Sequence, residues 1–457
     1  MIRIFITNMC NDDNKGDLSL LQNTIGLLRR HFQDAQIIVQ NGDYSKKDIF
    51  RYQLHRYTQR LADHYHGSFF PRTYIGGNGQ KSGPIFFLAV RVLTSVWIQL
   101  VNLLSIHLGP RLRFLVPSTH REAWCDLIAC DLVIAKGGSY IYSYGGFKRL
   151  LFTYRMLYTL TLAAVLGKRI ILLGHSIGPF RSRTLALLAG RLLLRTDKIM
   201  LREKLSYDYC LQELGLPRKK LEIIPDLAFA FGSLAETPTD GIVRKIAKNE
   251  DISGLSQEDF LVAMTARNWW FPGQPNPQGL FDRYLKVMIE VITELRRRYR
   301  AKVFFIPHCL EDIEFMGKLH SSLKDRTDVF LLRGDYSPEE LREILQIFQF
   351  IIGTRIHSNI LALTAGIPVI AIAYEIHKGF GILEMAGQRD FVFDISKLDS
   401  RDLLAAVATI IARQPELRAS IRQRTSALRE ELDRKVLAYL ATVISPNECP
   451  QTYRNMS

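Results

Sequence analysis

Short apolar, β-rich runs alternate with longer helical patterns along most of this 457-residue chain. In the first half, the sequence predicts strands at 2–7, 36–39, 132–135, 169–173, 198–201 and 221–224, with helices such as 17–32 and 154–166 between them. This β-α-β alternation is typical of a parallel sheet that is covered by helices on both faces. The alternation therefore restricts the chain to the α/β class.

The same alternation restarts after a stretch rich in Gly, Ser, Thr and Pro around 231–242, which indicates a linker. The sequence then predicts strands at 260–265, 302–307, 329–332, 350–353 and 369–373, separated by helices at 281–299, 311–323, 338–348 and 358–365. We therefore expect two doubly wound, Rossmann-like domains, 1–235 and 243–457, joined by a linker at 236–242 and facing each other across a cleft. Such sheets bind ligands where the carboxyl ends of the strands meet the following loops.

The charge balance points to an anionic partner. The chain has 60 Lys and Arg against 45 Asp and Glu, a formal net charge of +15. A phosphorylated metabolite, an acidic glycan, a nucleic acid or an anionic lipid would satisfy this charge. The basic residues are scattered over predicted loops and helix ends, so we expect no nucleic-acid binding.

The six cysteines form no C-x-x-C pair, and no cluster with metal-ligand spacing is visible, so we expect no metal. A chain of this length does not depend on disulfides, which favours a reducing compartment. The apolar run at the N-terminus is too short for a signal peptide. Together these features predict a cytoplasmic protein.

The segment 85–108 is largely apolar and long enough to cross a bilayer. Arg91, Gln99 and Asn102 interrupt it, which disfavours a true span. A buried helix is the expected structure. The alternative is an interfacial helix on the inner face of the plasma membrane, which would suit a membrane-anchored substrate.

Two glycine-containing loops follow strands in the first half. In the first loop, Asn14 precedes Gly16, which permits close backbone approach, and Asp17 is a natural helix N-cap. Gly137 and Gly138 follow the strand 132–135 and suggest backbone that approaches a ligand. The alternative interpretation of the first loop is a mere turn followed by a helix cap. The alternative interpretation of Gly137 and Gly138 is a flexible connection. The first loop lacks the G-x-G-x-x-G pattern, so a nicotinamide cofactor is not expected.

Polar residues also follow the next strands. His175 and Ser176 lie in a Gly-x-x-x-Gly-Pro loop, where His175 either lines the cleft or hydrogen-bonds its own loop. Arg202 ends a strand and suits capture of a carboxylate or phosphate, or else forms a surface pair with Glu203. Asp226 is either a general base or a helix cap.

The second half contains the strongest local pattern. Arg355, His357 and Ser358 come directly after an apolar strand and open a helix. A cation, an imidazole and helix N-terminal amides there suit an anionic substrate and proton transfer. Arg267, which precedes two tryptophans, and His308 follow two other strands.

An ordered set of these motifs, over about residues 1–390, resembles the polysaccharide pyruvyl transferase family. The set comprises Asn14-Lys15-Gly16-Asp17, Gly137-Gly138, Ser176-Ile177-Gly178-Pro179, Arg202-Glu203, Pro225-Asp226, Arg355-Ile356-His357-Ser358 and Ala365-Gly366-Ile367-Pro368. The first loop is longer and richer in Asn and Asp than is usual in the family, and the apolar segment 85–108 is not part of the pattern.

The resemblance implies a two-domain fold like that of the GT-B glycosyltransferases. It also implies transfer of the enolpyruvyl group of phosphoenolpyruvate to a sugar of a polysaccharide or its lipid-linked precursor, as a pyruvate ketal, with no other cofactor. The donor would bind in the C-terminal domain and the acceptor in the N-terminal domain. Arg355 and His357 match the donor-binding R-x-H pattern, with His357 as the acid, and Arg202 is expected to provide a second anion contact.

Two other functions remain open from the sequence. A GT-B glycosyltransferase that uses a nucleotide sugar would share the architecture and the Gly366-Ile367-Pro368 turn. A non-catalytic basic module that binds acidic glycan or a membrane would share the net charge.

Overall fold

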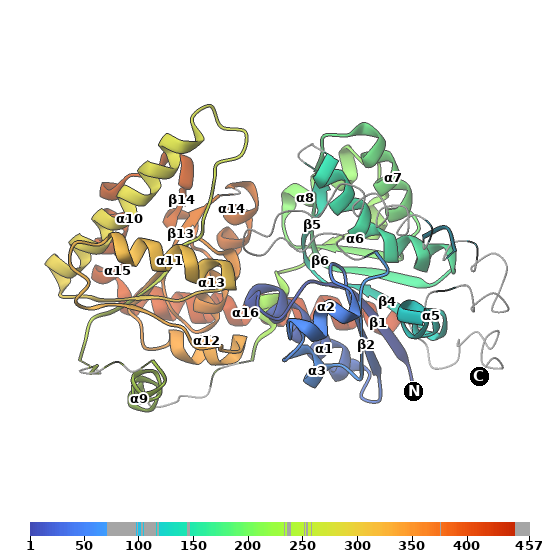
Figure 1. Cartoon of the computed structure of the whole chain (residues 1–457), viewed down its shortest axis with the longest axis horizontal. Coiled ribbons are helices and arrows are strands. Elements are labelled where there is room, and N and C mark those ends of the chain that lie inside the picture. Colours follow the sequence, from blue (N-terminus) through green and yellow to red (C-terminus); the bar gives the residue numbers. More distant parts are fainter. Residues whose placement is uncertain are drawn as a thin grey trace. The chain divides into compact units, whose positions relative to one another are not determined.

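The computed structural model describes residues 1–70, 97, 99–101, 104, 116, 118–143, 147–232, 234, 239–250, 252, 255–256, 258–374 and 376–443. They form two compact units. Unit 1 contains the described residues among Met1–Asp12, Leu20–Ile224 and Lys435–Ser457, and unit 2 those among Asp13–Ser19 and Pro225–Arg434. The ribbon of each unit is drawn in Figure 1.

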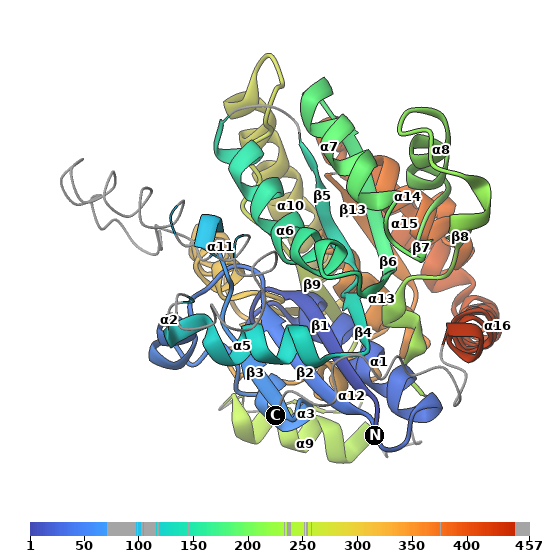
Figure 2. The ribbon, with the colours of Figure 1, turned by 90° about the vertical axis from the view of Figure 1, so that its right-hand side faces the viewer.

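Unit 1 is built on a parallel sheet in the order β3-β2-β1-β4-β6-β7-β8, with β5 paired to β6. Its strands are β1 (Arg3–Met9), β2 (Gln36–Asn41), β3 (His64–His66), β4 (Leu132–Ala135), β5 (Gly138–Ser143), β6 (Arg169–Phe180), β7 (Lys198–Leu201) and β8 (Leu221–Ile223). Its helices are α1 (Lys15–His31), which begins in unit 2, α2 (Lys46–Arg51), α3 (Thr58–Leu61), α5 (Ser118–Ala129), α6 (Phe147–Val165), α7 (Arg183–Leu193), α8 (Lys204–Gln212) and the 3-10 turn η2 (Arg218–Lys220). Figure 2 shows α5 crossing the strands at the β3 end of this sheet.

Unit 2 is built on a six-stranded parallel sheet in the order β11-β10-β9-β12-β13-β14. Its strands are β9 (Leu261–Thr265), β10 (Lys302–Phe305), β11 (Val329–Leu331), β12 (Phe350–Gly353), β13 (Val369–Ala373) and β14 (Val392–Asp394). Its helices are η3 (Leu227–Ala230), α9 (Thr239–Asn249), α10 (Pro277–Tyr299), α11 (Leu310–Ser322), α12 (Pro338–Leu345), α13 (Ile356–Thr364), α14 (Ile376–Met385), η4 (Arg389–Phe391), η5 (Ile395–Lys397), α15 (Ser400–Ala412) and α16 (Gln414–Val443), which ends in unit 1.

Both sheets are buried between helices. Every residue of β9, β12 and β13 is buried, which is typical of parallel strands that are covered on both faces. In unit 2 the chain adds β10 and β11 on one side of β9 and then places β12 on the other side. This reversal creates a topological switch point at the carboxyl ends of β9 and β12, where doubly wound folds bind ligands.

The division of the chain differs from the ranges expected from composition. The chain leaves the first sheet at Pro225, before the predicted linker 236–242, because η3 packs against α13 in unit 2. Residues 236–238 lie outside the described part, and α9 begins at Thr239. The segment Asp13–Ser19 belongs to unit 2, and the end of α16 returns to unit 1.

Two predicted loops in unit 1 are strands. The loop expected after 169–173 continues β6 as far as Phe180, and Gly138 begins β5. The two segments pair with each other, with Gly138 opposite His175. Their hydrogen bonding outweighs the preference of these glycines for loops, so the prediction of loops at His175 and Gly138 was wrong.

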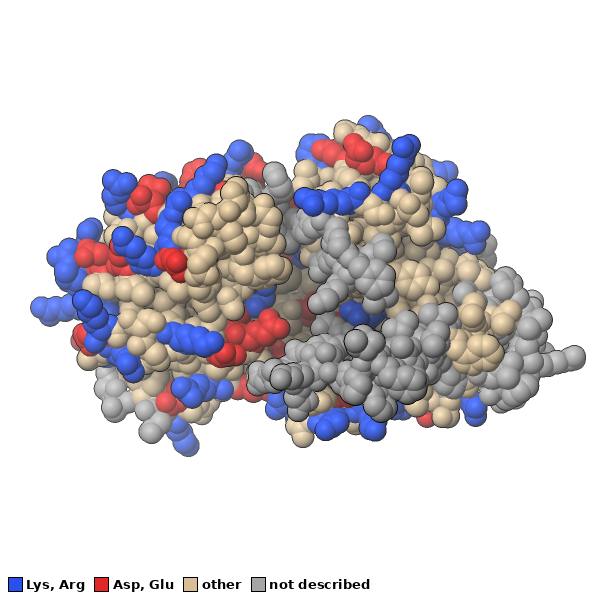
Figure 3. All heavy atoms as spheres, turned by 45° about the horizontal axis from the view of Figure 1, so that its top comes forward, with Lys and Arg blue, Asp and Glu red and all other residues tan. Residues whose placement is uncertain are grey.

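No helix of the described residues is long and apolar enough to cross a membrane. Most of the apolar segment 85–108 lies outside the described residues, which include only 97, 99–101 and 104 of it. Over the face drawn in Figure 3, Lys and Arg side chains are interspersed with Asp and Glu rather than gathered in one stripe.

Candidate active site

Side-chain hydrogen bonds fix the conformation of the turn from β12 into α13 in unit 2. A Cβ on Gly353 would lie 1.8 Å from the side-chain oxygen of Asn359, whose amide donates to the carbonyl of Gly353 at 3.1 Å. The Thr354 N–H donates to Thr265 Oγ1 at the end of β9, at 3.0 Å. Arg355, the residue before α13, is therefore placed at the switch point, at the carboxyl ends of β9 and β12.

A buried carboxylate orients Arg355. The Arg355 Nη2 donates to Asp312 Oδ1 at 2.6 Å. The second oxygen of Asp312 accepts the backbone N–H groups of His308 and Cys309, at 3.2 and 3.1 Å, and so caps α11. Asp312 thereby joins the residues that follow β10 and β12. The Arg355 Nε is buried without a hydrogen-bond partner among the described residues, although 14% of the side chain is exposed.

His357 lies in the first turn of α13 beside a second buried carboxylate. Its Nε2 is 3.9 Å from Asp226 Oδ2, and 15% of its side chain is exposed. Asp226 Oδ1 also accepts the Ala228 N–H at 2.9 Å, so the same carboxylate both caps η3 and faces the imidazole. Gly16 allows the imidazole to lie against the start of α1, because a Cβ there would come within 2.4 Å of His357 Nδ1.

The first loop of the chain contributes to this site through Asn14 and Lys15. Asn14 Oδ1 accepts the N–H groups of Gly16 and Asp17, at 3.1 and 3.3 Å, so Asn14 caps α1. The prediction that Asp17 is the N-cap was wrong: Asp17 lies in the first helical turn and accepts from the Asn14 amide at 2.8 Å. The Lys15 N–H donates to the His308 carbonyl at 3.0 Å, and Lys15 Nζ bonds to Asp335 at 2.6 Å.

His308 lies next to His357 in a different electrostatic environment. The two rings stack with centroids 6.5 Å apart and planes 14° apart. Burial lowers the pKa of His308 well below its usual value, and the nearby charges of His357, Arg355 and Lys15 lower it further. His308 is therefore a neutral imidazole at physiological pH, and its buried Nε2 has no hydrogen-bond partner among the described residues.

Arg267 and Ser358 complete the predicted residues of unit 2. The Arg267 guanidinium lies over the rings of Tyr374 and Trp269, 4.3 and 5.1 Å from their centroids. Its Nε is buried without a partner among the described residues. Ser358 is buried; its hydroxyl donates to the Arg355 carbonyl at 2.7 Å and lies 3.3 Å from Thr265 Oγ1. Ser358 therefore fixes the start of α13.

Unit 2 thus places cations beside carboxylates at the carboxyl ends of three adjacent strands. The contributors are Lys15, Arg267, Arg355, His357 when protonated, and the N-terminal ends of α1, α11 and α13. Asp226, Asp312 and Asp335 each face one of these cations. This arrangement suits an anion bound next to a proton donor.

In unit 1, the structure brings together a different subset of the predicted residues. His175 is fully buried, and its Nε2 is 2.6 Å from the hydroxyl of Tyr140. Arg202 is 2% exposed, and its Nε donates to Ser176 Oγ at 2.8 Å. These contacts correspond to the structural interpretation of His175.

The glycines of this subset lie where β4 passes into β5. Gly137 and Gly138 are both buried, and Gly138 has a φ of 152°, a backbone conformation that favours glycine. Burial lowers the pKa of the nearby His175 well below its usual value, with further lowering by Arg202 and the buried Lys136. The imidazole in this region is therefore held neutral.

The sequence did not identify Lys15 and Asp312 as site residues. Asp312 is the third residue of α11 after Cys309 at the N-cap, a capping pattern that indicates a helix start. Nothing in that pattern shows that the carboxylate also reaches Arg355, 43 positions away.

Solved structures similar to this chain have the same fold at low sequence identity. A glycosyltransferase from Rickettsia africae has a TM-score of 0.54 at 11% identity, covering 97% of this chain and 98% of that chain. A UDP-GlcNAc 2-epimerase from Neisseria meningitidis bound to UDP-GlcNAc has a TM-score of 0.53 at 10% identity, covering 97% and 100%. The predicted fold class, two doubly wound α/β domains of the GT-B type, is confirmed.

Sequence comparisons identify the family. The amylovoran biosynthesis protein AmsJ of Erwinia amylovora is 22% identical over 324 residues, which cover 67% of this chain and 71% of that protein. A sequence model described as polysaccharide pyruvyl transferase matches residues 14–376, from Asn14 to beyond the Arg355 and His357 pair. The chain belongs to the polysaccharide pyruvyl transferase family.

Proposed function

We propose that this protein transfers the enolpyruvyl group of phosphoenolpyruvate to a sugar of a polysaccharide or its lipid-linked precursor. The product is a pyruvate ketal, and inorganic phosphate is released. Family membership and the similarity to a protein named for amylovoran biosynthesis support this reaction type. In this proposal phosphoenolpyruvate is a co-substrate and the reaction uses no resident cofactor.

The observation that carries the proposal is the pair of Arg355 and His357 at the start of α13, each facing a buried carboxylate. Phosphoenolpyruvate has a carboxylate and a phosphate, so its site needs cations on more than one side. Among the described residues, Arg355 Nε and Arg267 Nε have no hydrogen-bond partner. Each of these N–H groups can donate to an oxygen of a carboxylate or phosphate.

His357 is the proposed acid. The carboxylate of Asp226, 3.9 Å from Nε2, stabilises the protonated ring. His308 stays neutral nearby, because burial lowers its pKa well below the usual value. One imidazole of the stacked pair is thus suited to proton transfer, and the other to hydrogen bonding without added charge.

The proposed reaction starts with proton transfer from His357 to the methylene carbon of phosphoenolpyruvate. The C=C electron pair forms the new C–H bond, and C2 becomes an oxocarbenium ion. A sugar hydroxyl attacks C2, and its proton returns to His357. The bond from C2 to the phosphate oxygen then breaks, and phosphate leaves with the electron pair, which regenerates the oxocarbenium ion. A second hydroxyl attacks this ion and closes the ketal, and its proton passes to the phosphate. Positioned acid catalysis of this kind contributes about 10²–10⁴-fold to the rate.

Arg355 supports this reaction by facing the phosphate that leaves. A fixed guanidinium stabilises the charge that develops as the C2–O bond breaks. In this proposal the acceptor binds to the N-terminal part of the chain. If that acceptor is lipid-linked, the protein works in the cytoplasm at the inner face of the plasma membrane.

The proposal is tested by thermal stabilisation with phosphoenolpyruvate, UDP and GDP. The proteins are the wild type, Arg355→Lys and, as a control, Arg401→Lys at an exposed arginine of α15. Lysine keeps a positive charge beside Asp312 and removes the planar guanidinium. A ligand at 100 times its Kd adds about 2.7 kcal/mol to the free energy of unfolding.

We expect phosphoenolpyruvate to stabilise the wild type and Arg401→Lys, and to stabilise Arg355→Lys much less. Stabilisation by UDP or GDP, with none by phosphoenolpyruvate, would contradict the proposed donor. Equal stabilisation of all three proteins by phosphoenolpyruvate would support the donor and contradict the role of Arg355.

A further inference from the structure

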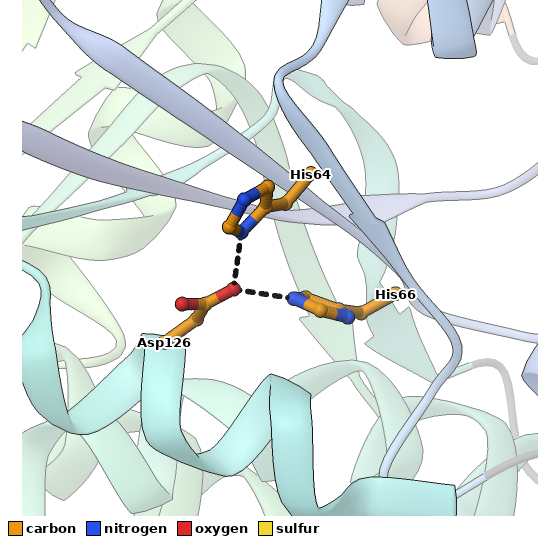
Figure 4. Close-up of side chains that lie close together, drawn as sticks. All are labelled: His64, His66 and Asp126. Carbon is orange, nitrogen blue, oxygen red and sulfur yellow. Dashed lines mark hydrogen bonds and ion pairs between the residues drawn. The ribbon is translucent and has the colours of Figure 1, made fainter.

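Two histidines and an aspartate meet at the edge of the unit 1 sheet. His64 and His66 are two positions apart in β3, so their side chains leave the same face of the strand. Asp126 reaches them from α5, as Figure 4 shows. Its Oδ2 is 2.8 Å from His64 Nδ1 and 2.7 Å from His66 Nε2. One ligand atom from each of the three residues lies within 4.8 Å of the others.

Arg3 holds the second oxygen of the same carboxylate. Its Nη2 bonds to Asp126 Oδ1 at 2.6 Å, which leaves Oδ2 facing the two imidazoles. The orientation of the carboxylate is therefore fixed by a partner that does not occupy the facing oxygen.

We propose that His64, His66 and Asp126 bind a divalent transition-metal ion, foremost Zn²⁺, that joins β3 to α5. Two imidazoles and one carboxylate suit Zn²⁺ and its neighbours in the first transition row, whereas Mg²⁺ and Ca²⁺ prefer sets of oxygen ligands. Three protein ligands leave a fourth position for water. His64 is on the open side of the cluster, because 44% of its side chain is exposed.

Metal binding requires the three ligand atoms, which lie within 4.8 Å of one another, to move to tetrahedral spacing. Ligands around a tetrahedral Zn²⁺ with bonds of about 2.0–2.1 Å lie ~3.3 Å from each other. The imidazole nitrogens lie 2.8 and 2.7 Å from Asp126 Oδ2, so they must move away from it by about 0.5 Å. The exposed His64 has room for this movement. Arg3 then acts as the outer partner that orients a ligating carboxylate.

The position of the cluster explains what the metal would do. β3 has three residues, and among the described strands it lies at the edge of the sheet and pairs with β2 alone. A metal bound by β3 and α5 would fasten this short edge strand to the helix beside it. The site is independent of the donor site proposed in unit 2.

The experiment is a Zn²⁺ titration of the full chain, without a polyhistidine tag and after treatment with a chelator, followed by calorimetry. The variants are His64→Ala, which changes the most exposed ligand, and Asp126→Asn, which keeps the shape of the side chain. The control is His31→Ala at the end of α1, outside the cluster. Thermal melting with and without Zn²⁺ is the second readout.

We expect one Zn²⁺ per chain in the wild type and in His31→Ala, and weaker binding by more than about tenfold in His64→Ala and Asp126→Asn. Zn²⁺ should raise the melting temperature of the wild type and not that of His64→Ala, and Mg²⁺ should have no effect. Absence of stoichiometric Zn²⁺ binding, or equal binding by the wild type and His64→Ala, would overturn the proposal. The three residues would then be a hydrogen-bonded group only.

Discussion

In unit 1, His175 within β6 and Arg202 after β7 are sealed inside the fold, whereas in unit 2 the Arg355 and His357 side chains that follow β12 stay partly exposed. Each pair consists of a histidine and an arginine on a parallel sheet. The order β3-β2-β1-β4 in unit 1 corresponds to β11-β10-β9-β12 in unit 2. His175 is fully buried beside Tyr140, and Arg202 bonds to Ser176. A histidine and an arginine near the carboxyl end of a strand therefore do not by themselves indicate a binding site.

The two histidines, His175 in unit 1 and His357 in unit 2, differ more in their charged neighbours than in their positions on the sheets. His175 is close to the cations Arg202 and Lys136, which lower its pKa further after burial. His357 faces the buried carboxylate of Asp226. The first environment keeps the imidazole of His175 neutral. We therefore propose that the chemistry takes place in unit 2 and that the His175 group of unit 1 has a structural role.

The largest expected effect is on His357. Replacing it with Asn removes the proposed acid but leaves a side chain of similar size. We expect the rate of phosphate release from phosphoenolpyruvate to fall by about 10²–10⁴-fold, with little change in melting temperature. The control is His31→Asn at the C-terminal end of α1, whereas His357 lies against the start of that helix. Near-normal turnover in His357→Asn would contradict the proposed difference in role between His357 and His175.

The matching change in unit 1 should act on stability. His175→Ala leaves a cavity and removes one of the partners of the Tyr140 hydroxyl, so we expect the free energy of unfolding to fall by about 2–4 kcal/mol. Chemical denaturation measures this loss. Turnover per folded molecule should stay close to that of the wild type. A loss of turnover with unchanged stability would move His175 into the catalytic group.

His175→Ala should also change the pH dependence of stability. Because the pKa of His175 is lowered in the folded state, the unfolded chain binds a proton first as pH falls below about 6.5. The contribution of the neutral side chain to stability is complete above that pH and is lost progressively towards the folded pKa. Denaturation at several pH values should give a shallower slope in His175→Ala than in the wild type. An unchanged slope would contradict this assignment.

Gly16→Ala tests the placement of His357 without changing the imidazole. The added Cβ would lie 2.4 Å from Nδ1, so the ring must move. We expect turnover to fall by about 100-fold, as for small displacements of catalytic groups. Gly26→Ala is the control in the same helix, because its Cβ meets nothing within 4 Å. That change should leave turnover intact and add up to about 1 kcal/mol of stability. Equal turnover in both variants would show that the position of the ring is not critical.

The smallest expected effect is on Arg267. Its guanidinium lies over Tyr374 and Trp269, and its Nε has no partner among the described residues. Arg267→Ala should weaken phosphoenolpyruvate binding by roughly five- to tenfold, or about 1 kcal/mol. Calorimetric titration measures this change. Unchanged affinity would limit the role of Arg267 to packing against the two aromatic rings.

Much of the fold could be predicted from the sequence, because strands buried on both faces produce continuous apolar runs. The predicted strand 350–353 coincides with β12, and 198–201 with β7. β3 was missed because its three residues, His-Tyr-His, have no apolar run. The extension of β6 was missed because its glycines resemble a loop until β5 pairs with them.

The candidate site could be predicted only in part. Arg355, His357 and His308 were found because residues at the carboxyl ends of parallel strands converge. Their carboxylate partners depend on tertiary contacts: Asp312 is 43 positions from Arg355. The assignment of Asp13–Ser19 to unit 2 rests on contacts such as the bond from the Lys15 N–H to the His308 carbonyl, which no local pattern reveals.

The central claim is that the donor site lies at the start of α13 in unit 2. The most direct test is the affinity for phosphoenolpyruvate, measured by calorimetric titration of the wild type, Arg355→Lys and Arg202→Lys. Both variants keep the charge and lose the planar guanidinium. The account predicts affinity reduced by more than about tenfold in Arg355→Lys and unchanged in Arg202→Lys. Reduced affinity in Arg202→Lys with normal affinity in Arg355→Lys would contradict it.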